Sequence, residues 1–351
     1  MDIKLLREKL WAGQLTRREL LKNAGLLGLS AAALQTLGPV AAHASPNAII
    51  EPADKKWRMA HSPGGLASST WEARGVETMK MIGDLTGIDV VVFDGNGSTP
   101  DQRKALEDMA GQDWTFASCH PWAIDAYVDP INQMIKRGIP FFQLDTKISS
   151  KEGEVDYVTF LEPDNIYMGT QVTQVLVDAI GGKGEVVHTQ GVLTHTGAQG
   201  RAKGFHMIVD KYPDIKVVDE TPGNWNPNAT RTLWEDLLVK YPNIKGAMFH
   251  NDDMALAAYQ AIKAAGKEKD IKLAGVDAME PAIKALMEGK LLTTVVNPTG
   301  RIHGGCMWIG WFLATGKKKK ADVPKYIWTD GPVVTDKVAA GLLFLAENLL
   351  I

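Results

Sequence analysis

The chain has 351 residues, with 38 lysines and arginines against 41 aspartates and glutamates, a formal net charge of -3 and 45% hydrophobic residues. Its length and apolar content exclude a disordered chain and favour two domains. The near-neutral charge gives no reason to expect a nucleic acid as partner.

The first 44 residues have the pattern of an export signal. Six lysines and arginines lie within residues 1–22, residues 23–44 carry no acidic or basic side chain except a histidine, and Ala-His-Ala at 42–44 offers a small-x-small cleavage site. The junction TRRELLK at 16–22 resembles a twin-arginine export signal. An amphipathic helix or a membrane anchor is the alternative, but a spanning helix needs about 20 apolar residues and this run is shorter.

We therefore expect cleavage near Ala44 and export to the periplasm by the twin-arginine machinery. Six basic and three acidic residues leave with the signal, so the mature chain has 32 basic and 38 acidic residues, a net charge of -6.

From Trp57 onward, short apolar runs alternate with helical patterns, which predicts an α/β fold with parallel sheets. Apolar residues recur with a helical period at 172–179 and 254–261. Runs with the length and composition of buried strands lie at 90–93, 140–144, 185–189, 246–249 and 272–276. These units are too many for one open sheet, so we expect two doubly wound lobes.

Polar residues follow the predicted strands. Ligands of parallel α/β sheets bind outside the carboxyl ends of the strands, so these positions indicate the site. Their donors and acceptors suit vicinal hydroxyl groups. The residues are Asp94, His120, Asp145, Gln190, Asn251, Asp277 and Asn297.

Several of these side chains have a simpler alternative role. Asn251 could only cap the helix that follows it. Trp225, in the loop TPGNWNPNAT, could stack on the C–H face of a sugar or could cover a hydrophobic edge. Arg201, in GAQGRAKGF, offers a planar fork of donors. For His120 and His195, a place in the site and a place in the core are equally open.

The sequence offers little for catalysis. It contains no G-x-S-x-G elbow, no G-x-x-x-x-G-K-[ST] phosphate loop, no H-E-x-x-H motif and no G-x-G-x-x-G after a strand. Cys119 and Cys306 have no metal-ligand spacing, and we expect two buried thiols. His188 and His250 are expected to be hydrogen-bonded core residues. We therefore expect no catalytic residue, no cofactor and no metal.

Two long stretches resemble the periplasmic sugar-binding proteins of the ribose-binding type, which deliver solutes to ABC importers. They are FHNDDMALAAYQAIKAAGK from Phe249 and IKLAGVDAMEPAIKALMEGKLLTTVVNP from Ile271, and the resemblance covers nearly all of the mature chain. The binding residues of that family in the second lobe and at the hinge fall on Arg201, Trp225, Asn251, Asp277 and Asn297.

The first lobe departs from this family. The stretch GIPFFQLDTKI keeps the family's acid at Asp145, but Thr146 stands where an arginine is usual. In HSPGGLASSTWEARG, serines stand near the usual aromatic pair, and Trp71 or Trp122 could replace those aromatics. The departures favour a smaller or acyclic ligand, such as a pentitol or tetritol. First-lobe contacts are expected from Asp145, with help from Ser69 and His120.

The resemblance implies a type I periplasmic-binding-protein fold with a hinge that the chain crosses three times. The N-terminal lobe would comprise 55–161 plus 298–325, and the C-terminal lobe 162–297 plus 326–351. Crossings would lie near Glu162-Pro163, Asn297-Pro298 and Tyr326-Ile327.

The function implied is that of a monomeric periplasmic receptor that closes on a small polyhydroxylated ligand and presents it to an ABC permease in the inner membrane. Two alternatives remain. An exported enzyme acting on a sugar or polyol could use Asp145 and Asp277 for acid/base chemistry. A ligand sensor would have a chemoreceptor or a histidine kinase as its partner.

Overall fold

The computed structural model describes residues 57–329, 331, 333–336, 339 and 343. The predicted export signal at 1–44 lies outside this part of the chain. Within the described residues, no helix has both the length and the apolar content needed to cross a membrane.

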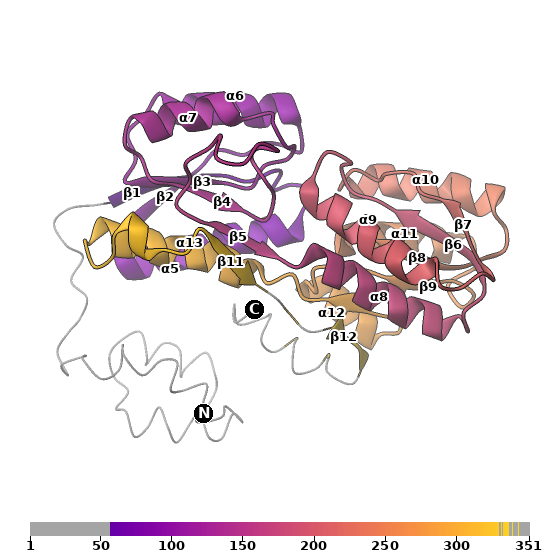
Figure 1. Cartoon of the computed structure of the whole chain (residues 1–351). Helices are drawn as coiled ribbons and strands as arrows, with labels where there is room; N and C mark the ends of the chain where they lie inside the picture. Colours follow the sequence, from indigo (N-terminus) through magenta and orange to yellow (C-terminus); the bar gives the residue numbers. More distant parts are fainter. Residues whose placement is uncertain (1–56, 330, 332, 337–338, 340–342, 344–351) are drawn as a thin grey trace, which may run out of the picture. The chain divides into compact units, whose positions relative to one another are not determined.

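Six parallel strands form the first sheet, in the order β11-β5-β4-β3-β1-β2. Helices α6 and α7 cover one face, and α5 and α13 cover the other (Figure 1). The strands are β1 (Trp57–Ser62), β2 (Ile88–Val92), β3 (Phe116–Cys119), β4 (Phe141–Leu144), β5 (Phe160–Pro163) and β11 (Tyr326–Thr329). The helices are α5 (Thr70–Thr86), α6 (Thr99–Ala110), α7 (Val128–Lys136) and α13 (Thr299–Ala314).

Alternate strand residues of this sheet enter two cores on opposite faces. Met59 and Phe142 join the core formed with α5 and α13, whereas their neighbours Ala60 and Phe141 join the core formed with α6 and α7. This is the two-residue period of a strand. Because both faces are covered by helices, most strand positions are apolar, as the sequence predicted.

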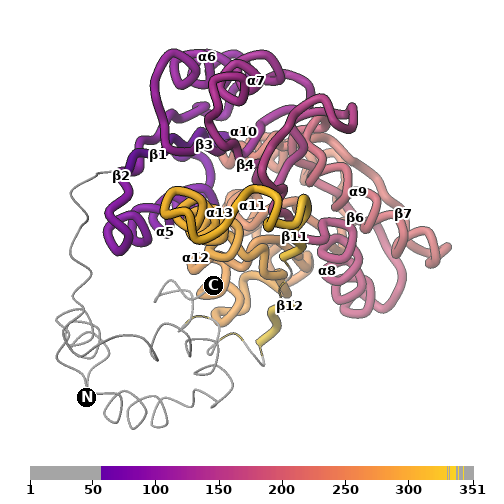
Figure 2. The backbone as a smooth tube through the Cα atoms, turned by 60° about the vertical axis from the view of Figure 1, so that its left-hand side comes forward, coloured from indigo at the N-terminus to yellow at the C-terminus, as the bar shows by residue number. Residues whose placement is uncertain are grey.

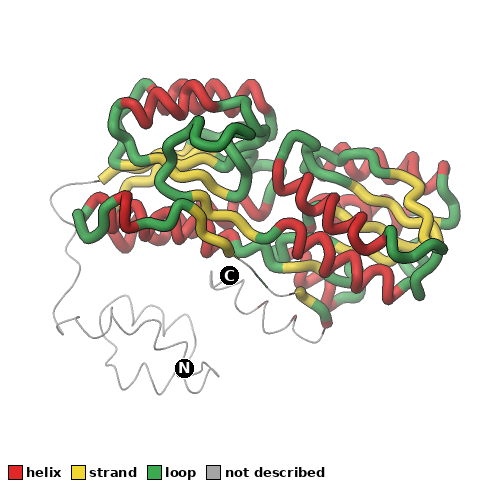
Figure 3. The backbone as a smooth tube through the Cα atoms, in the orientation of Figure 1, coloured by secondary structure: helices red, strands yellow, loops and turns green. Residues whose placement is uncertain are grey.

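Four parallel strands form the second sheet, in the order β7-β6-β8-β9. Figure 3 shows the same alternation of strands and helices in both sheets. The strands are β6 (Gly184–Thr189), β7 (Ile215–Asp219), β8 (Ile244–Phe249) and β9 (Lys272–Ala274). The helices are α8 (Asn165–Ala179), α9 (Thr196–Val209), α10 (Pro227–Lys240), α11 (Asp252–Ala264) and α12 (Glu280–Met287).

A short antiparallel pair joins β10 (Thr294–Val295) to β12 (Val333–Val334). Bridges from Thr293 to Ala274 and from Val296 to Asp277 attach this pair to the edge of the second sheet. A single 3-10 turn, η1 (Lys320–Asp322), follows α13.

The chain passes between the sheets after β5, before α13 and between β11 and β12. The predicted boundary at residue 326 differs from this path, because β11 pairs with β5 along its whole length and so belongs to the first sheet. Helix α13 lies beside α5, more than 200 residues earlier in the chain, in both views (Figure 1, Figure 2). Cys119 and Cys306 are buried free thiols, as expected.

We predict that Trp234→Ala destabilises the second sheet strongly. Trp234 is fully buried, and its indole Nε1 donates to Thr189 Oγ1 at 3.0 Å. Its removal leaves a cavity and should lower the free energy of unfolding by about 3–5 kcal/mol in urea unfolding followed by circular dichroism. The matched control is Trp328→Ala, at a side chain that is 61% exposed. The control should change stability by less than about 1 kcal/mol, and equal losses would contradict this packing.

Candidate functional site

Polar side chains from both sheets surround one small cavity of about 40 Å³. All eight residues from which ligand contacts were expected line it, namely Ser69, His120, Asp145, Arg201, Trp225, Asn251, Asp277 and Asn297. Four more line it with them: Trp71, Glu72, Trp122 and His195. The strand ends therefore bring residues as far apart in the chain as His120 and Asn297 to one cavity.

The first sheet contributes an acid and an imidazole from adjacent strand ends. Asp145 follows β4, His120 follows β3, and His120 Nε2 lies 3.3 Å from Asp145 Oδ2. Asp145 has a left-handed backbone with φ of 53°, a conformation that non-glycine residues adopt rarely and mostly at functional sites. Ser69 caps α5 by accepting from the Glu72 N–H at 3.2 Å.

His120 takes the electrostatic role of the missing arginine. Its Nδ1 lies 2.6 Å from Glu72 Oε1. Burial alone would lower the pKa of His120, but the carboxylates of Glu72 and Asp145 outweigh burial and raise it to about 10. Burial would raise the pKa of Asp145, but the hydrogen bond and charge of His120 hold it well below its usual range. Thr146, at the expected arginine position, leaves the space that His195 occupies.

His195 is neutral and forms a hydrogen bond with the hydroxyl of Thr146. Burial, followed by the charge of His120, lowers the pKa of His195 to about 3. The Gly197 N–H donates to His195 Nδ1 at 3.1 Å, and His195 Nε2 lies 2.6 Å from Thr146 Oγ1 and 3.0 Å from His120 Nε2. His195 therefore belongs to the site, one of the two roles left open for it.

The second sheet contributes an arginine and two strand-end residues. Arg201, on α9, donates from Nε to Asn165 Oδ1 at 3.0 Å and from Nη1 to the carbonyl of His250. Its Nη2 lies 3.7 Å from Asp277 Oδ1. Asn251 caps α11 by accepting from the Met254 N–H at 3.0 Å and also lines the cavity, so capping and site roles coincide.

Trp225 and Asp277 lie on unusual backbone. Trp225 has φ of 55° and Asp277 has φ of 115°. The Arg201 guanidinium carbon is 5.5 Å from the centre of the Trp225 ring, a cation–π contact that also orients the ring. Gly191 faces this ring so closely that a Cβ there would lie 2.0 Å from it. The left-handed backbone at Trp225 and the absence of a side chain at Gly191 together hold the Trp225 ring at the cavity.

Asn297 connects the two sheets. Its Nδ2 lies 3.4 Å from Asp145 Oδ1 and 3.3 Å from Asp277 Oδ1. Its backbone carbonyl accepts from Trp71 Nε1 at 3.0 Å, which brings the first turn of α5 to the same point. The amide of Asn297 thus hydrogen-bonds to Asp145 of the first sheet and to Asp277 of the second.

Sequence reasoning was less specific at other positions. Asp94 and Gln190 follow strands but do not line the cavity: Asp94 accepts from the N–H groups of Leu66 and Asn96, and Gln190 donates to the Glu220 carbonyl. Glu72 was missed, and its only sequence signal is its place three residues after a capping serine. His188 and His250 hydrogen-bond to each other at 2.7 Å in the core, as expected.

Comparison with known proteins identifies the family. Residues 62–318 match the family described as periplasmic binding protein domain. The chain belongs to the periplasmic binding protein family. This confirms the resemblance seen in the sequence and the predicted α/β fold with two parallel sheets.

Related proteins in this family are described as binding proteins. A xylitol-binding protein of Mycolicibacterium smegmatis is 27% identical over 261 residues, which are 74% of this chain and 73% of that protein. A D-apiose import binding protein of Actinobacillus succinogenes is 32% identical over 236 residues, 66% of this chain and 67% of that protein. The periplasmic binding protein component of the arabinose ABC transporter from a Shewanella species, solved with L-arabinofuranose, has a TM-score of 0.75, 26% identity and coverage of 83% and 96%.

We predict that Asp277 makes this periplasmic binding protein less stable as pH rises. Burial raises the pKa of Asp277 from 3.8 to about 8, and the nearby Arg201 offsets only part of this effect. Between these values the folded chain holds a proton that the unfolded chain has released, so the free energy of unfolding falls as pH increases and the fall is complete above about 8.

The isosteric variant Asp277→Asn cannot titrate at this position, so its free energy of unfolding should not fall for this reason as pH rises. Urea unfolding across pH 4–8 should therefore show wild type losing stability relative to the variant. Parallel pH profiles of the two proteins would contradict the shifted pKa.

Proposed function

We propose that this protein captures a small sugar or polyol in the periplasm and delivers it to an ABC importer. The observation that carries the proposal is the ring of polar strand ends from both sheets, with one aromatic face, around a single cavity. Acids, amides and a guanidinium are the groups that bond vicinal hydroxyls, and a tryptophan suits the C–H face of a sugar. The relatives' descriptions as import binding proteins favour transport over sensing.

Binding requires the two sheets to separate and close again. The cavity of about 40 Å³ has room for only a few water molecules. Contacts across the cavity hold it closed, such as those of Asp253 with the backbone N–H of Thr70 at 2.8 Å and with its hydroxyl at 3.0 Å. A ligand would enter an open form and replace the direct bonds of Asn297 with its own hydroxyls.

Each sheet with its helices would move as one lobe. The hinge would comprise the three segments in which the chain changes sheets, near Pro163, near Asn297 and Pro298, and between β11 and β12. The lobe division proposed from the sequence stands with residues 326–329 reassigned to the first lobe. We further propose a monomer, exported by the twin-arginine machinery, with its signal cleaved near Ala44.

The proposed ligand is a pentitol, a tetritol or a pentose. Trp71 and Trp122 line the cavity on the side of the first sheet, where the family's aromatic pair is missing. His120 and His195 also line the cavity. The relatives described as binding xylitol and D-apiose support this size.

A thermal-shift screen tests the ligand class. Erythritol, xylitol, D-ribose and D-glucose would be compared, and a four- or five-carbon compound is expected to raise the melting temperature most. A ligand at 100 times its dissociation constant should add about 2.7 kcal/mol to the free energy of unfolding. The absence of any shift across sugars and polyols at millimolar concentration would contradict the proposed function.

Arg201→Ala should weaken binding of the best ligand from that screen. The loss leaves hydroxyl and carboxylate partners unpaired and should cost about 1–3 kcal/mol of binding free energy in isothermal titration calorimetry. The matched control is Arg231→Ala, because Arg231 pairs with Glu235 on the exposed side of α10. Equal affinities of the two variants would remove Arg201 from the site, and circular dichroism would establish that both are folded.

A further inference from the structure

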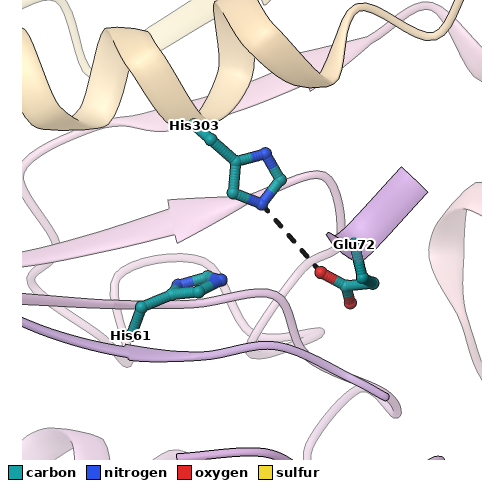
Figure 4. Close-up of side chains that lie close together, drawn as sticks. All are labelled: His61, Glu72 and His303. Atoms are coloured by element: carbon teal, nitrogen blue, oxygen red, sulfur yellow. Dashed lines mark ion pairs between the residues drawn. The ribbon is translucent and has the colours of Figure 1, made fainter. Parts of the chain in front are cut away.

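Next to the ligand cavity lies a second cluster, formed by His61, Glu72 and His303 (Figure 4). His61 is at the end of β1, Glu72 in the first turn of α5, and His303 on α13. Both histidines are fully buried, and Glu72 is 2% exposed. Figure 4 shows the three side chains pointing toward a common space from three elements.

One atom of each side chain faces this space without a partner among the described residues. These atoms are His61 Nε2, Glu72 Oε2 and His303 Nε2. The other side-chain polar atoms of the cluster all have hydrogen-bond partners. His61 Nδ1 lies 2.9 Å from Ser118 Oγ, and Glu72 Oε1 accepts from the Gly64 N–H at 2.7 Å. Three unpaired buried polar atoms side by side are unusual, because each forfeits its hydration.

The tautomer of His303 follows from its neighbours. His303 Nδ1 lies 3.0 Å from the Thr299 carbonyl, which can only accept, so Nδ1 carries the proton and Nε2 presents a lone pair. If His61 donates its Nδ1–H to Ser118, its Nε2 presents a lone pair as well.

With His61 in this tautomer, all three atoms that face the space are acceptors. Glu72 Oε2 and His303 Nε2 are 4.0 Å apart, too far for a direct hydrogen bond. A water molecule can donate only two hydrogen bonds and would leave one of the three acceptors unpaired. A cation satisfies all three together.

We propose that His61, Glu72 and His303 bind a zinc ion. Two imidazoles and one carboxylate are a frequent zinc ligand set, with the fourth position taken by water. One ligand atom from each of the three residues lies within 4.8 Å of those of the other two, so some point lies within about 2.8 Å of all three, and small side-chain movements reach the zinc distances of about 2.0–2.2 Å.

The surroundings of the cluster are those of a metal site. Each imidazole is oriented by a hydrogen bond through its other nitrogen, the usual arrangement for histidine ligands of metals. Gly75 lies one helical turn after Glu72, and a Cβ there would be 2.4 Å from the His303 ring, so the glycine makes room for the ligand. Because Glu72 also lines the ligand cavity, the ion can enter through that cavity.

Two other groups of potential ligands are less suited. His120, Asp145 and His195 belong to the sugar site and already pair with one another and with Thr146. In the group of His188, His206 and Glu220, the shared carboxylate oxygen already bonds both histidines, at 2.9 and 2.8 Å. The cluster of His61, Glu72 and His303 instead presents three unpartnered atoms toward one space.

Zinc titration of chelator-treated protein tests the proposal. Wild type should bind one zinc ion per chain in isothermal titration calorimetry, and His303→Gln and His61→Gln should weaken this binding by at least about 100-fold. His206→Gln, which disables the group on the second lobe, should bind zinc as wild type does. The proposal is overturned if wild type binds no zinc or if the His303 and His61 variants bind it as tightly as wild type.

A measurement on wild type alone covers the case in which these variants do not fold. Crystals soaked in zinc should give an anomalous peak between His61 Nε2, Glu72 Oε2 and His303 Nε2. A peak only at other positions, or none, would refute the site. Neither result bears on whether the neighbouring cavity takes a sugar, because that function is tested with sugars and with Arg201→Ala.

Discussion

The site depends on Asn297, because its amide joins the carboxyl ends of the two sheets. The amide Nδ2 lies 3.4 Å from Asp145 and 3.3 Å from Asp277. Two buried carboxyl groups that face each other repel when both are ionised, so each needs a donor or a cation nearby. The closed arrangement that we propose for the lobes would meet this constraint, and a polyol that offers several hydroxyls can meet it more fully.

The two acids meet this constraint differently. Asp145 has the His120 cation at 3.3 Å, and its pKa is held below the usual range, so it can only accept hydrogen bonds. Asp277 has Arg201 at 3.7 Å, but burial keeps its pKa near 8, so at neutral pH it can donate as well. A hydroxyl group both donates and accepts, whereas a second carboxylate could only add to the repulsion. The electrostatics of the cavity therefore favour a neutral, polyhydroxylated ligand.

The sequence predicted those parts of the site whose positions follow from chain order. Asp145 directly follows β4 and Asp277 lies three residues after the end of β9, and the ends of parallel strands lie on one edge of a sheet. Local patterns could not place Glu72, because a glutamate in the first helical turn is ordinarily exposed. Here it is buried beside Gly64, His120 and His303, which come from distant parts of the chain. For the same reason, local patterns could not predict that His61 lies close to His303, more than 200 residues later in the chain. They also assigned β11 to the wrong lobe, because its partner β5 lies far back in the chain.

A crystal structure of the protein with the best-binding sugar or polyol tests the central claim most directly. We expect the ligand in the cavity, with hydroxyl groups bonded to Asp145 from the first sheet and to Arg201 and Asp277 from the second, and one carbon face against Trp225. The direct contacts of Asn297 with at least one acid should be replaced by contacts with the ligand. A ligand bonded to one sheet only, or bound away from these strand ends, would contradict the account.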